Sequence, residues 1–503
     1  MSTQEFDKLI ELLQPANQKG SIAARLHFDD QTGSPPDEEA KKQLAQLMAL
    51  AEREAHELFT ADSISQALTG RTGLSLTEQR MVDRLQLSHD MAKRIPPEFV
   101  QKQREHIQAA NRVWIEARQK SDFTLFQNTF TKSVELAREE AIMLGADSGR
   151  PETYYPALLP IYEPGMDFAR LREIIEAVQG PTVDLLGRIT SSGKEFTDKL
   201  WRGYFEIDRQ KSLGQTAAWL MGYDFKRGIL KVTVHPFMST VGLNDCRITT
   251  RYDPTYLPQA LGGVMHEAGH GLYEQNVAEA IRRFITVPLV HSHGIHESSS
   301  LLWECFVGRS KPFLQFFHPI LTALFEQYRD VSVDELYQAI NRVMPSFIRV
   351  EADELTYNLH IILRFGMEPE ILAGNIKPED VPAEWNRRFK ELFGIAVDTD
   401  ANGCLQDIHW SHGYFGYFPT YLLGKLGAAQ LFAAFVKAVP SWQEQFRMGN
   451  FRVLLDWLCK NVYPYGHVSA MDDLMVKATG EKLNPKYWFD HLEEKFGQLY
   501  GLN

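Results

Sequence analysis

The residues His266-Glu267-Ala268-Gly269-His270 place two imidazoles and one carboxylate close together in the chain. On a helix, side chains four residues apart share a face, with their Cβ atoms about 5–6 Å apart. Two imidazoles at that spacing reach one Zn²⁺ at about 2.0–2.1 Å. Glu267 lies beside the ligand face, where it can hold a water without binding the metal. The segment therefore predicts a catalytic site for one Zn²⁺ per chain, with Co²⁺ as the alternative metal.

A catalytic zinc needs a third protein ligand and an open position for water. The segment HSHGIHESSSLLWE, which enters a predicted helix, offers the candidates. Glu297 lies at the start of this helix and Glu304 about two turns later on the same side, so spacing does not choose between them. The histidines of the segment are further candidates, although residues of this kind more often support ligands or face solvent: His291, His293 and His296.

Helical patterns dominate the chain around these residues. Leucines recur at helical spacings among charged residues over 37–67, and the run 96–144 begins with Pro-Pro and is followed by glycine. Residues 147–164 are rich in Pro, Tyr and Gly and predict a long ordered loop. Helix is expected again over 255–274, which carries the two histidines, and onward to the C-terminus.

Strand character is confined to 228–252, just before the histidine helix. Residues 228–237 and 246–252 contain β-branched residues in near alternation and are separated by a loop with Gly and Asn. They predict a short antiparallel pair, and the expected fold class is mainly α with a small antiparallel sheet. No boundary divides the chain sharply. Residues 1–503 are therefore expected to form one domain, with a helical N-terminal part over about 1–150 and the catalytic motifs over about 228–410.

Composition excludes several classes of protein. Of 503 residues, 44% are hydrophobic and 23% charged, as in globular proteins. The net charge of −12 does not suit a nucleic-acid binder. No apolar run reaches the roughly 18 residues of a membrane helix, and the N-terminus has no signal pattern. We expect a cytoplasmic protein that binds neither nucleic acid nor membrane, with its four widely spaced cysteines reduced.

HEAGH followed by HESSS resembles the carboxypeptidase Taq family of zinc carboxypeptidases. One departure from the family pattern is Ser299, where the family usually has Gln or Gly. Four further motifs match in order, namely His235-Pro236-Phe237 for HPF, Asp245-Cys246-Arg247-Ile248-Thr249 for DxRxT, Ile348-Arg349-Val350-Glu351-Ala352-Asp353 for IRxxAD, and Gly403-Cys404-Leu405-Gln406-Asp407-Ile408-His409-Trp410 for GxxQDxHW.

This resemblance implies a function and a fold. It implies that Glu297 is the third zinc ligand and that Glu267 is the catalytic acid/base. It also implies a large helical, zincin-like fold with a deep substrate groove, a homodimer, and removal of single residues from the C-termini of peptide substrates. Two alternatives stay open on the residues alone: another zinc peptidase, acting as an endo- or aminopeptidase, and a non-catalytic helical interaction protein.

A carboxypeptidase needs a cation for the terminal carboxylate of its substrate, and the planar fork of arginine binds a carboxylate through two hydrogen bonds. Arg349, in an otherwise apolar stretch, is predicted to do so; the alternative is a structural ion pair with Glu351 or Asp353. Arg247 is instead expected to make a structural pair with Asp245 or another acidic residue.

Two further residues are assigned to the substrate. His409 is predicted to form a hydrogen bond with the substrate. The alternative is a histidine in the protein core whose hydrogen bonds are all made within the protein. Tyr417 and Tyr421 belong to an aromatic run whose members mostly pack, but one phenol can donate to the oxyanion of the scissile carbonyl. Tyr421 is the predicted donor.

Overall fold

The computed structural model describes residues 3–33, 37–69, 73–283, 287 and 289–502. Contacts group the chain into two compact units, each assembled from three separate stretches of sequence. The first unit comprises Met1–Ala92, Thr197–Ile340 and Gly424–Leu483, and the second comprises Lys93–Phe196, Asn341–Leu423 and Asn484–Asn503. The prediction of one domain over 1–503 stays a prediction.

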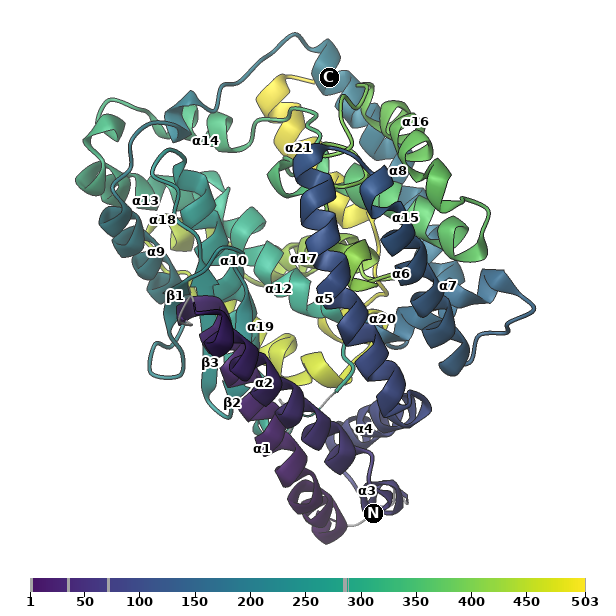
Figure 1. Ribbon diagram of the computed structural model, residues 1–503. Helices are drawn as coiled ribbons and strands as arrows, with labels where there is room; N and C mark the ends of the chain where they lie inside the picture. The colour runs from purple at the N-terminus through teal and green to yellow at the C-terminus, as the bar shows by residue number, and fades with distance from the viewer. Residues whose placement is uncertain (1–2, 34–36, 70–72, 284–286, 288, 503) are drawn as a thin grey trace. The chain divides into compact units, whose positions relative to one another are not determined.

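The first unit holds the sheet and the helix with the two histidines (Figure 1). Its elements are α1 (Thr3–Gly33), α2 (Glu38–Phe59), α3 (Asp62–Ala67), most of α4 (Leu76–Arg94), η3 (Lys199–Trp201), α9 (Ile207–Met221), β1 (Leu230–Val232), β2 (Met238–Gly242), β3 (Asp245–Thr250), α10 (Leu257–Asn276), α11 (Glu279–Arg282), α12 (His293–Leu301), the π-helix η4 (Leu302–Gly308), α13 (Lys311–Leu324), η5 (Glu326–Tyr328), α14 (Val333–Ile340), most of α17 (Pro419–Ala438), α18 (Trp442–Arg447), α19 (Arg452–Asn461), η9 (Tyr463–Val468) and α20 (Met471–Thr479).

The regular secondary structure described in the second unit is all helical, and loops such as 394–408 connect its helices. Its elements are α5 (Pro97–Lys120), α6 (Thr124–Met143), η1 (Pro151–Thr153), α7 (Tyr154–Leu158), η2 (Leu159–Ile161), α8 (Phe168–Ser191), η6 (Arg349–Glu351), α15 (Tyr357–Ala373), η7 (Pro378–Asp380), α16 (Val381–Phe393), η8 (His409–His412) and α21 (Lys486–Tyr500).

The sheet is mixed, with the strand order β1-β3-β2. β1 runs parallel to β3, with Leu230 opposite Ile248, so the predicted antiparallel pairing of 228–237 with 246–252 is wrong. The antiparallel partner of β3 is β2, whose Met238 lies opposite the same Ile248. The physical reason lies in two short connections. Pro236 has no N–H to donate to a neighbouring strand, and it lies in the connection between β1 and β2. Asn244, whose backbone is left-handed (φ 62°), closes a tight turn between β2 and β3.

Two segments with long helical patterns each form two helices. The segment 37–67 forms α2 and α3, and the Asp37 side chain accepts the N–H of Ala40 at 2.9 Å to start α2. The segment 96–144 forms α5 and α6. Ser121 is left-handed (φ 53°), and Asp122 then accepts the N–H of Thr124 at 2.9 Å.

The predicted long loop over 147–164 is wrong in part, because it contains η1, α7 and η2. The aromatic residues of the segment enter the core of the second unit and fix it there. Tyr155 is 1% exposed, and its ring lies 5.5 Å from that of Phe168 and 5.9 Å from that of Phe365. Burial of such rings stabilises short helical turns that local sequence alone would leave open.

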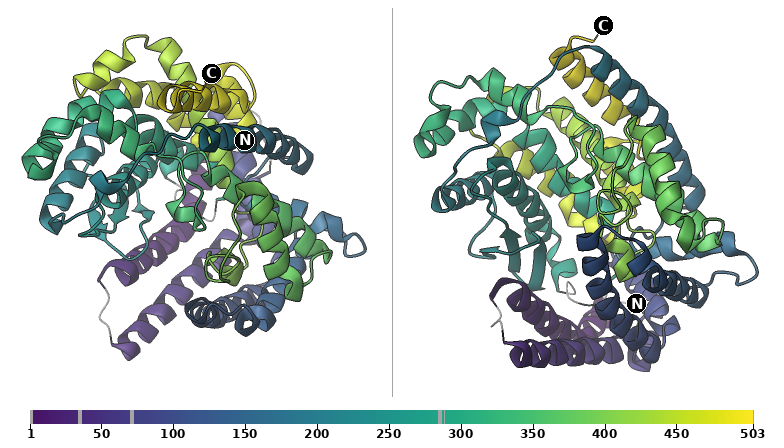
Figure 2. Two further views of the ribbon diagram at one scale, coloured as in Figure 1. Left: turned by 90° about the horizontal axis from the view of Figure 1, so that it is seen from above. Right: turned by 45° about the horizontal axis from the view of Figure 1, so that its top comes forward.

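The predicted helix over 255–274 is confirmed as α10. It packs on β3 and on α9 and α12, and Figures 1 and 2 show it beside the strands. Figures 1 and 2 also show α1 and α2 lying side by side, and α1 covers β2. All four cysteines are free, as expected. In the described part of the chain, no helix has the length and apolar character needed to cross a membrane.

Candidate metal centre

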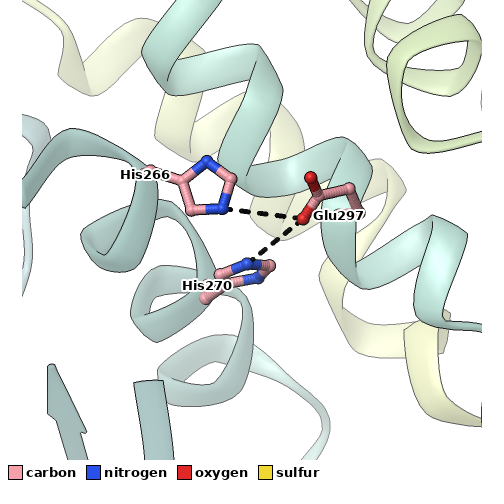
Figure 3. Close-up of side chains that lie close together, drawn as sticks. All are labelled: His266, His270 and Glu297. Atoms are coloured by element: carbon pink, nitrogen blue, oxygen red, sulfur yellow. Dashed lines mark ion pairs between the residues drawn. The ribbon is translucent and has the colours of Figure 1, made fainter. Parts of the chain in front are cut away.

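The structure brings together the three predicted metal ligands in the first unit (Figure 3). His266 and His270 come from α10, and Glu297 comes from α12. Oε2 of Glu297 lies 3.6 Å from Nε2 of His266 and 3.4 Å from Nε2 of His270. A tetrahedral zinc with bonds of about 2.0–2.1 Å places its ligand atoms about 3.3 Å apart. The three side chains therefore fit a metal ion without rearrangement of the helices.

Close contact between α10 and α12 makes this convergence possible. A Cβ on Gly269 would lie 2.7 Å from Cα of Ser300, closer than real Cβ contacts, so only glycine allows α12 to approach here. Ser299, the departure from the family pattern, is buried and donates its Oγ hydrogen bond to the carbonyl of Gly269 at 2.8 Å. A Cβ on Gly424 of α17 would likewise lie 2.5 Å from Cγ of Glu297. The small residues thus set where the third ligand stands.

Glu304 does not belong to the group of three ligands, although spacing could not separate it from Glu297. It lies in the π-helix η4, which follows α12 directly. Its Oε2 accepts a hydrogen bond from Nδ1 of His266 at 3.0 Å, and its Oε1 accepts one from Arg309 at 2.8 Å. A carboxylate on Nδ1 fixes the imidazole so that Nε2 faces the metal.

The three other candidate histidines do not contribute to the ligand group found in the described residues. His296 stacks on His270 with a centroid distance of 4.4 Å. His291 and His293 stack on each other at 5.0 Å. Burial lowers the pKa of His291 well below its ordinary range and that of His293 to about 4, so both rings are neutral near pH 7.

The centre is rich in negative charge. Glu267 is 6% exposed, and burial raises its pKa to about 7. Burial lowers the pKa of His266, but the carboxylates of Glu297, Glu304 and Glu267 outweigh it and raise that pKa to about 10. Burial, with His296 adding to it, lowers the pKa of His270 to about 3. Three carboxylates around two imidazoles are an environment that a divalent cation stabilises.

Arg349 is buried, at 6% exposure, in the second unit. The alternative to its substrate role, an ion pair with Glu351 or Asp353, is not found among the described residues. Its Nε and Nη2 instead donate to Oδ1 of Asp407 at 3.0 and 2.9 Å, and Nη1 donates to the Tyr357 hydroxyl at 2.7 Å. The other oxygen of Asp407 accepts a hydrogen bond from Nε of Arg364 at 2.7 Å. Two guanidinium groups thus share one carboxylate, which leaves one positive charge in excess.

His409 and Tyr421 lie in the same cluster as Arg349. Nε2 of His409 is 3.2 Å from the Tyr421 hydroxyl, and the guanidinium carbon of Arg349 lies 4.8 Å from the centre of the Tyr421 ring. Burial lowers the pKa of His409 to about 3, although Asp407 opposes this shift. The imidazole is therefore neutral near pH 7 and offers one hydrogen-bond donor.

Sequence reasoning missed several members of these sites. Asp407 was part of a recognised motif but had no assigned role, and Arg364 and Glu368 were not singled out. Arg364 and Glu368 are both 0% exposed and lie in the apolar segment HIILRFGMEPE of α15. Charged residues inside so apolar a run signal buried pairing, which could have identified them. The pair predicted between Arg247 and Asp245 is confirmed, with contacts of 3.0 and 2.9 Å.

These features coincide with one known family. The sequence profile of the carboxypeptidase Taq (M32) metallopeptidase family matches residues 8–496. The chain belongs to this family. Carboxypeptidase 1 of Bacillus subtilis (strain 168) is 34% identical over 508 residues, which cover 99% of this chain and 100% of that relative. Thermostable carboxypeptidase 1 of Thermus thermophilus is 32% identical over 510 residues, covering 99% of each chain.

Solved structures of the M32 family share the fold. The crystal structure of the M32 carboxypeptidase from Deinococcus radiodurans R1 matches with a TM-score of 0.92 and 34% identity, covering 99% of this chain and 100% of that chain. The prediction of a mainly helical protein with a small sheet is thereby confirmed. As an M32 member, the protein is a metallocarboxypeptidase, and the alternative of a non-catalytic helical protein falls away.

Proposed function

We propose that the protein is a zinc-dependent carboxypeptidase that removes single amino acids from the C-termini of peptides. The observation that carries this proposal is the convergence of His266, His270 and Glu297, with buried Glu267 next to His266 on the same helix. Two imidazoles and one carboxylate form a known hydrolytic zinc set, and Co²⁺ accepts the same donors. A zinc ion held there supplies Lewis-acid chemistry, which lowers the pKa of water to about 7 and polarises a carbonyl oxygen.

Glu267 is proposed to move the proton. Its carboxylate takes a proton from the attacking water and delivers it to the nitrogen of the leaving amino acid. Burial raises the pKa of Glu267 to about 7, and a group with a pKa near the working pH serves in both steps. Glu304 keeps the His266 ring in place during the reaction through its contact with Nδ1 at 3.0 Å.

Arg349 is proposed to bind the terminal carboxylate of the substrate. Three of its five N–H groups have partners in Asp407 and Tyr357. Each of the two terminal nitrogens keeps one N–H with no partner among the described residues, and this pair can form the fork that a carboxylate fits. The excess positive charge shared with Arg364 favours an anion. A blocked or amidated C-terminus would not satisfy these donors.

His409 and Tyr421 are proposed to act on the same end of the substrate. The neutral His409 imidazole has one N–H, which can donate either to the substrate or to the Tyr421 hydroxyl 3.2 Å away. The Tyr421 hydroxyl is proposed to donate to the carbonyl oxygen as negative charge develops on it. Support for these roles comes from their shared cluster with Arg349.

One peptide in three forms tests the function: free, N-terminally blocked and C-terminally amidated. A carboxypeptidase digests the first two and loses activity on the amide. Loss on the N-blocked form would indicate an aminopeptidase, and cleavage of all three at internal bonds would indicate an endopeptidase. Metal analysis of the same preparation should give about one zinc per chain. Absence of bound metal and of any hydrolysis would refute the proposal.

We further propose a homodimer in the cytoplasm, which the likeness to the M32 family supports. Sedimentation velocity over a tenfold range of concentration tests the dimer. A particle with the mass of a single chain throughout that range would refute it.

A further inference from the structure

Glu274 is a buried carboxylate to which the proposed reaction gives no role. It lies on α10, about two turns after His266, and is 4% exposed. Its Oε1 lies 3.0 Å from Nε2 of His296 and 2.9 Å from Nε2 of His467. Burial opposes ionisation of Glu274, but the two histidines outweigh it and hold its pKa below the ordinary range. An ionised carboxylate only accepts hydrogen bonds, so Nε2 of each histidine donates to it.

His296 connects this carboxylate to the metal centre. Its ring stacks on that of His270 at 4.4 Å, with an angle of 26° between the planes. His296 directly precedes Glu297 in the chain, while His467 comes from η9. Glu274 thus joins α10, α12 and η9 at a point next to two proposed ligands.

The two ligand histidines differ in what holds their rings. Nδ1 of His266 is hydrogen-bonded to Glu304 at 3.0 Å. Nδ1 of His270 is buried and has no hydrogen-bond partner among the described residues. An imidazole without a hydrogen bond at Nδ1 can rotate about its Cβ–Cγ bond. Such a rotation would turn Nε2 away from the metal. For His270, the stacked ring of His296 is in the position to prevent it.

We infer that Glu274 is a positioning residue for the metal centre, which fixes the plane of the His270 ring through His296. This inference rests on the proposed metal site and deepens it. Glu274 does for His270, by way of a stacked ring, what Glu304 does for His266 by a direct hydrogen bond.

Metal affinity tests the inference independently of activity. The full-length apoprotein is titrated with Co²⁺ against a competing chelator, and the visible absorption bands of the bound Co²⁺ report the ligand geometry. Glu274→Ala should weaken Co²⁺ binding by about 10–100-fold, the range found for supporting residues of metal sites, and should shift the bands. Glu274→Gln should recover most of the affinity, because the amide oxygen still accepts from both histidines.

A matched control separates positioning from general loss of stability. Glu354, in the second unit, is 3% exposed and also accepts a hydrogen bond from a histidine, His491, at 2.9 Å. Glu354→Ala should lower the melting temperature but leave the Co²⁺ dissociation constant and bands unchanged. Wild-type affinity and bands in Glu274→Ala would overturn the inference, as would an equal loss of affinity in Glu354→Ala.

A second pair of variants serves if Glu274→Ala does not fold. His296→Phe keeps a flat ring on His270, whereas His296→Ala removes it, so the Phe variant should bind Co²⁺ more tightly. Equal affinities would overturn the inference. A wild-type protein that binds no Co²⁺ would instead refute the proposed metal centre, and the inference with it.

Discussion

Removal of the Arg349 side chain should convert the enzyme from one that requires a free C-terminus into one that ignores it. The two N–H groups without partners would form a fork on the substrate carboxylate. Hydrogen bonds to a charged group contribute about 1.5–3 kcal/mol each, so the pair contributes about 3 kcal/mol at the low end. Arg349→Ala should therefore lower kcat/KM on free-acid peptides by about two orders of magnitude. Arg349→Lys should recover only part of the loss, because an ammonium group cannot form the fork.

The discriminating assay is the ratio of rates on free-acid and C-terminally amidated forms of one peptide. This ratio should fall toward one in Arg349→Ala, with metal content unchanged. Asp407 keeps Arg364 as its partner in the variant, so the second unit should remain folded. Arg247→Ala is a suitable control, because it removes an arginine of similar burial (7% exposed) that also makes two contacts to one aspartate. The control should be less stable but keep the ratio.

The reasoning is refuted if Arg349→Ala slows both substrates equally and also melts at a lower temperature. Arg349 would then be a structural partner of Asp407, and the group that binds the carboxylate would have to be sought elsewhere, first at His409.

Three further predictions concern buried carboxylates. Glu267→Gln should retain metal and fold but lose turnover by about 10²–10⁴-fold, since only proton transfer is removed; near-normal turnover of the purified variant would exclude that role. Glu297→Ala should lose its metal at micromolar chelator. Glu304→Ala should retain its metal at the same chelator concentration, with an affinity about tenfold below that of the wild type. Equal metal retention by both variants would exclude Glu297 as a ligand. For Glu368, burial raises the pKa from 4.5 to about 7. The folded state therefore binds this proton more tightly than the unfolded state does. The stability that the bound proton contributes is lost as the pH rises from 4.5 to 7. Glu368 alone should contribute a fall of about 3 kcal/mol in the free energy of unfolding between pH 4.5 and 7, and Glu368→Gln should lack this part of the slope in denaturant titrations.

The ligand pair could be recognised from sequence because it depends on local geometry. The four-residue spacing of His266 and His270 puts both on one face of any helix, whatever packs around it. The apolar and turn patterns that predict α10 are equally local, and its observed bounds, Leu257–Asn276, follow them closely.

Local patterns did not decide which face of a helix is buried. In α2 the regular spacing of the leucines predicts that they are buried, yet Leu47 is 54% exposed and Leu50 is 42% exposed. The buried residues of α2 are Ala51, Ala55 and Phe59. Small side chains allow α1 and α2 to approach closely, and this depends on the partner helix rather than on the pattern of α2 alone.

Contacts between distant segments were decided by the tertiary structure alone. Helical spacing left Glu297 and Glu304 equivalent, and they are separated because Glu297 joins the ligand group whereas Glu304 contacts Nδ1 of His266. The parallel pairing of β1 with β3 likewise depends on where the chain re-enters the sheet after Pro236. Sequence determines the type and local spacing of each charged group, whereas burial and the distance to a partner determine its pKa and its role. Glu274 shows this difference, because only its contacts with His296 and His467, over sequence separations of 22 and 193 residues, connect it to the metal centre.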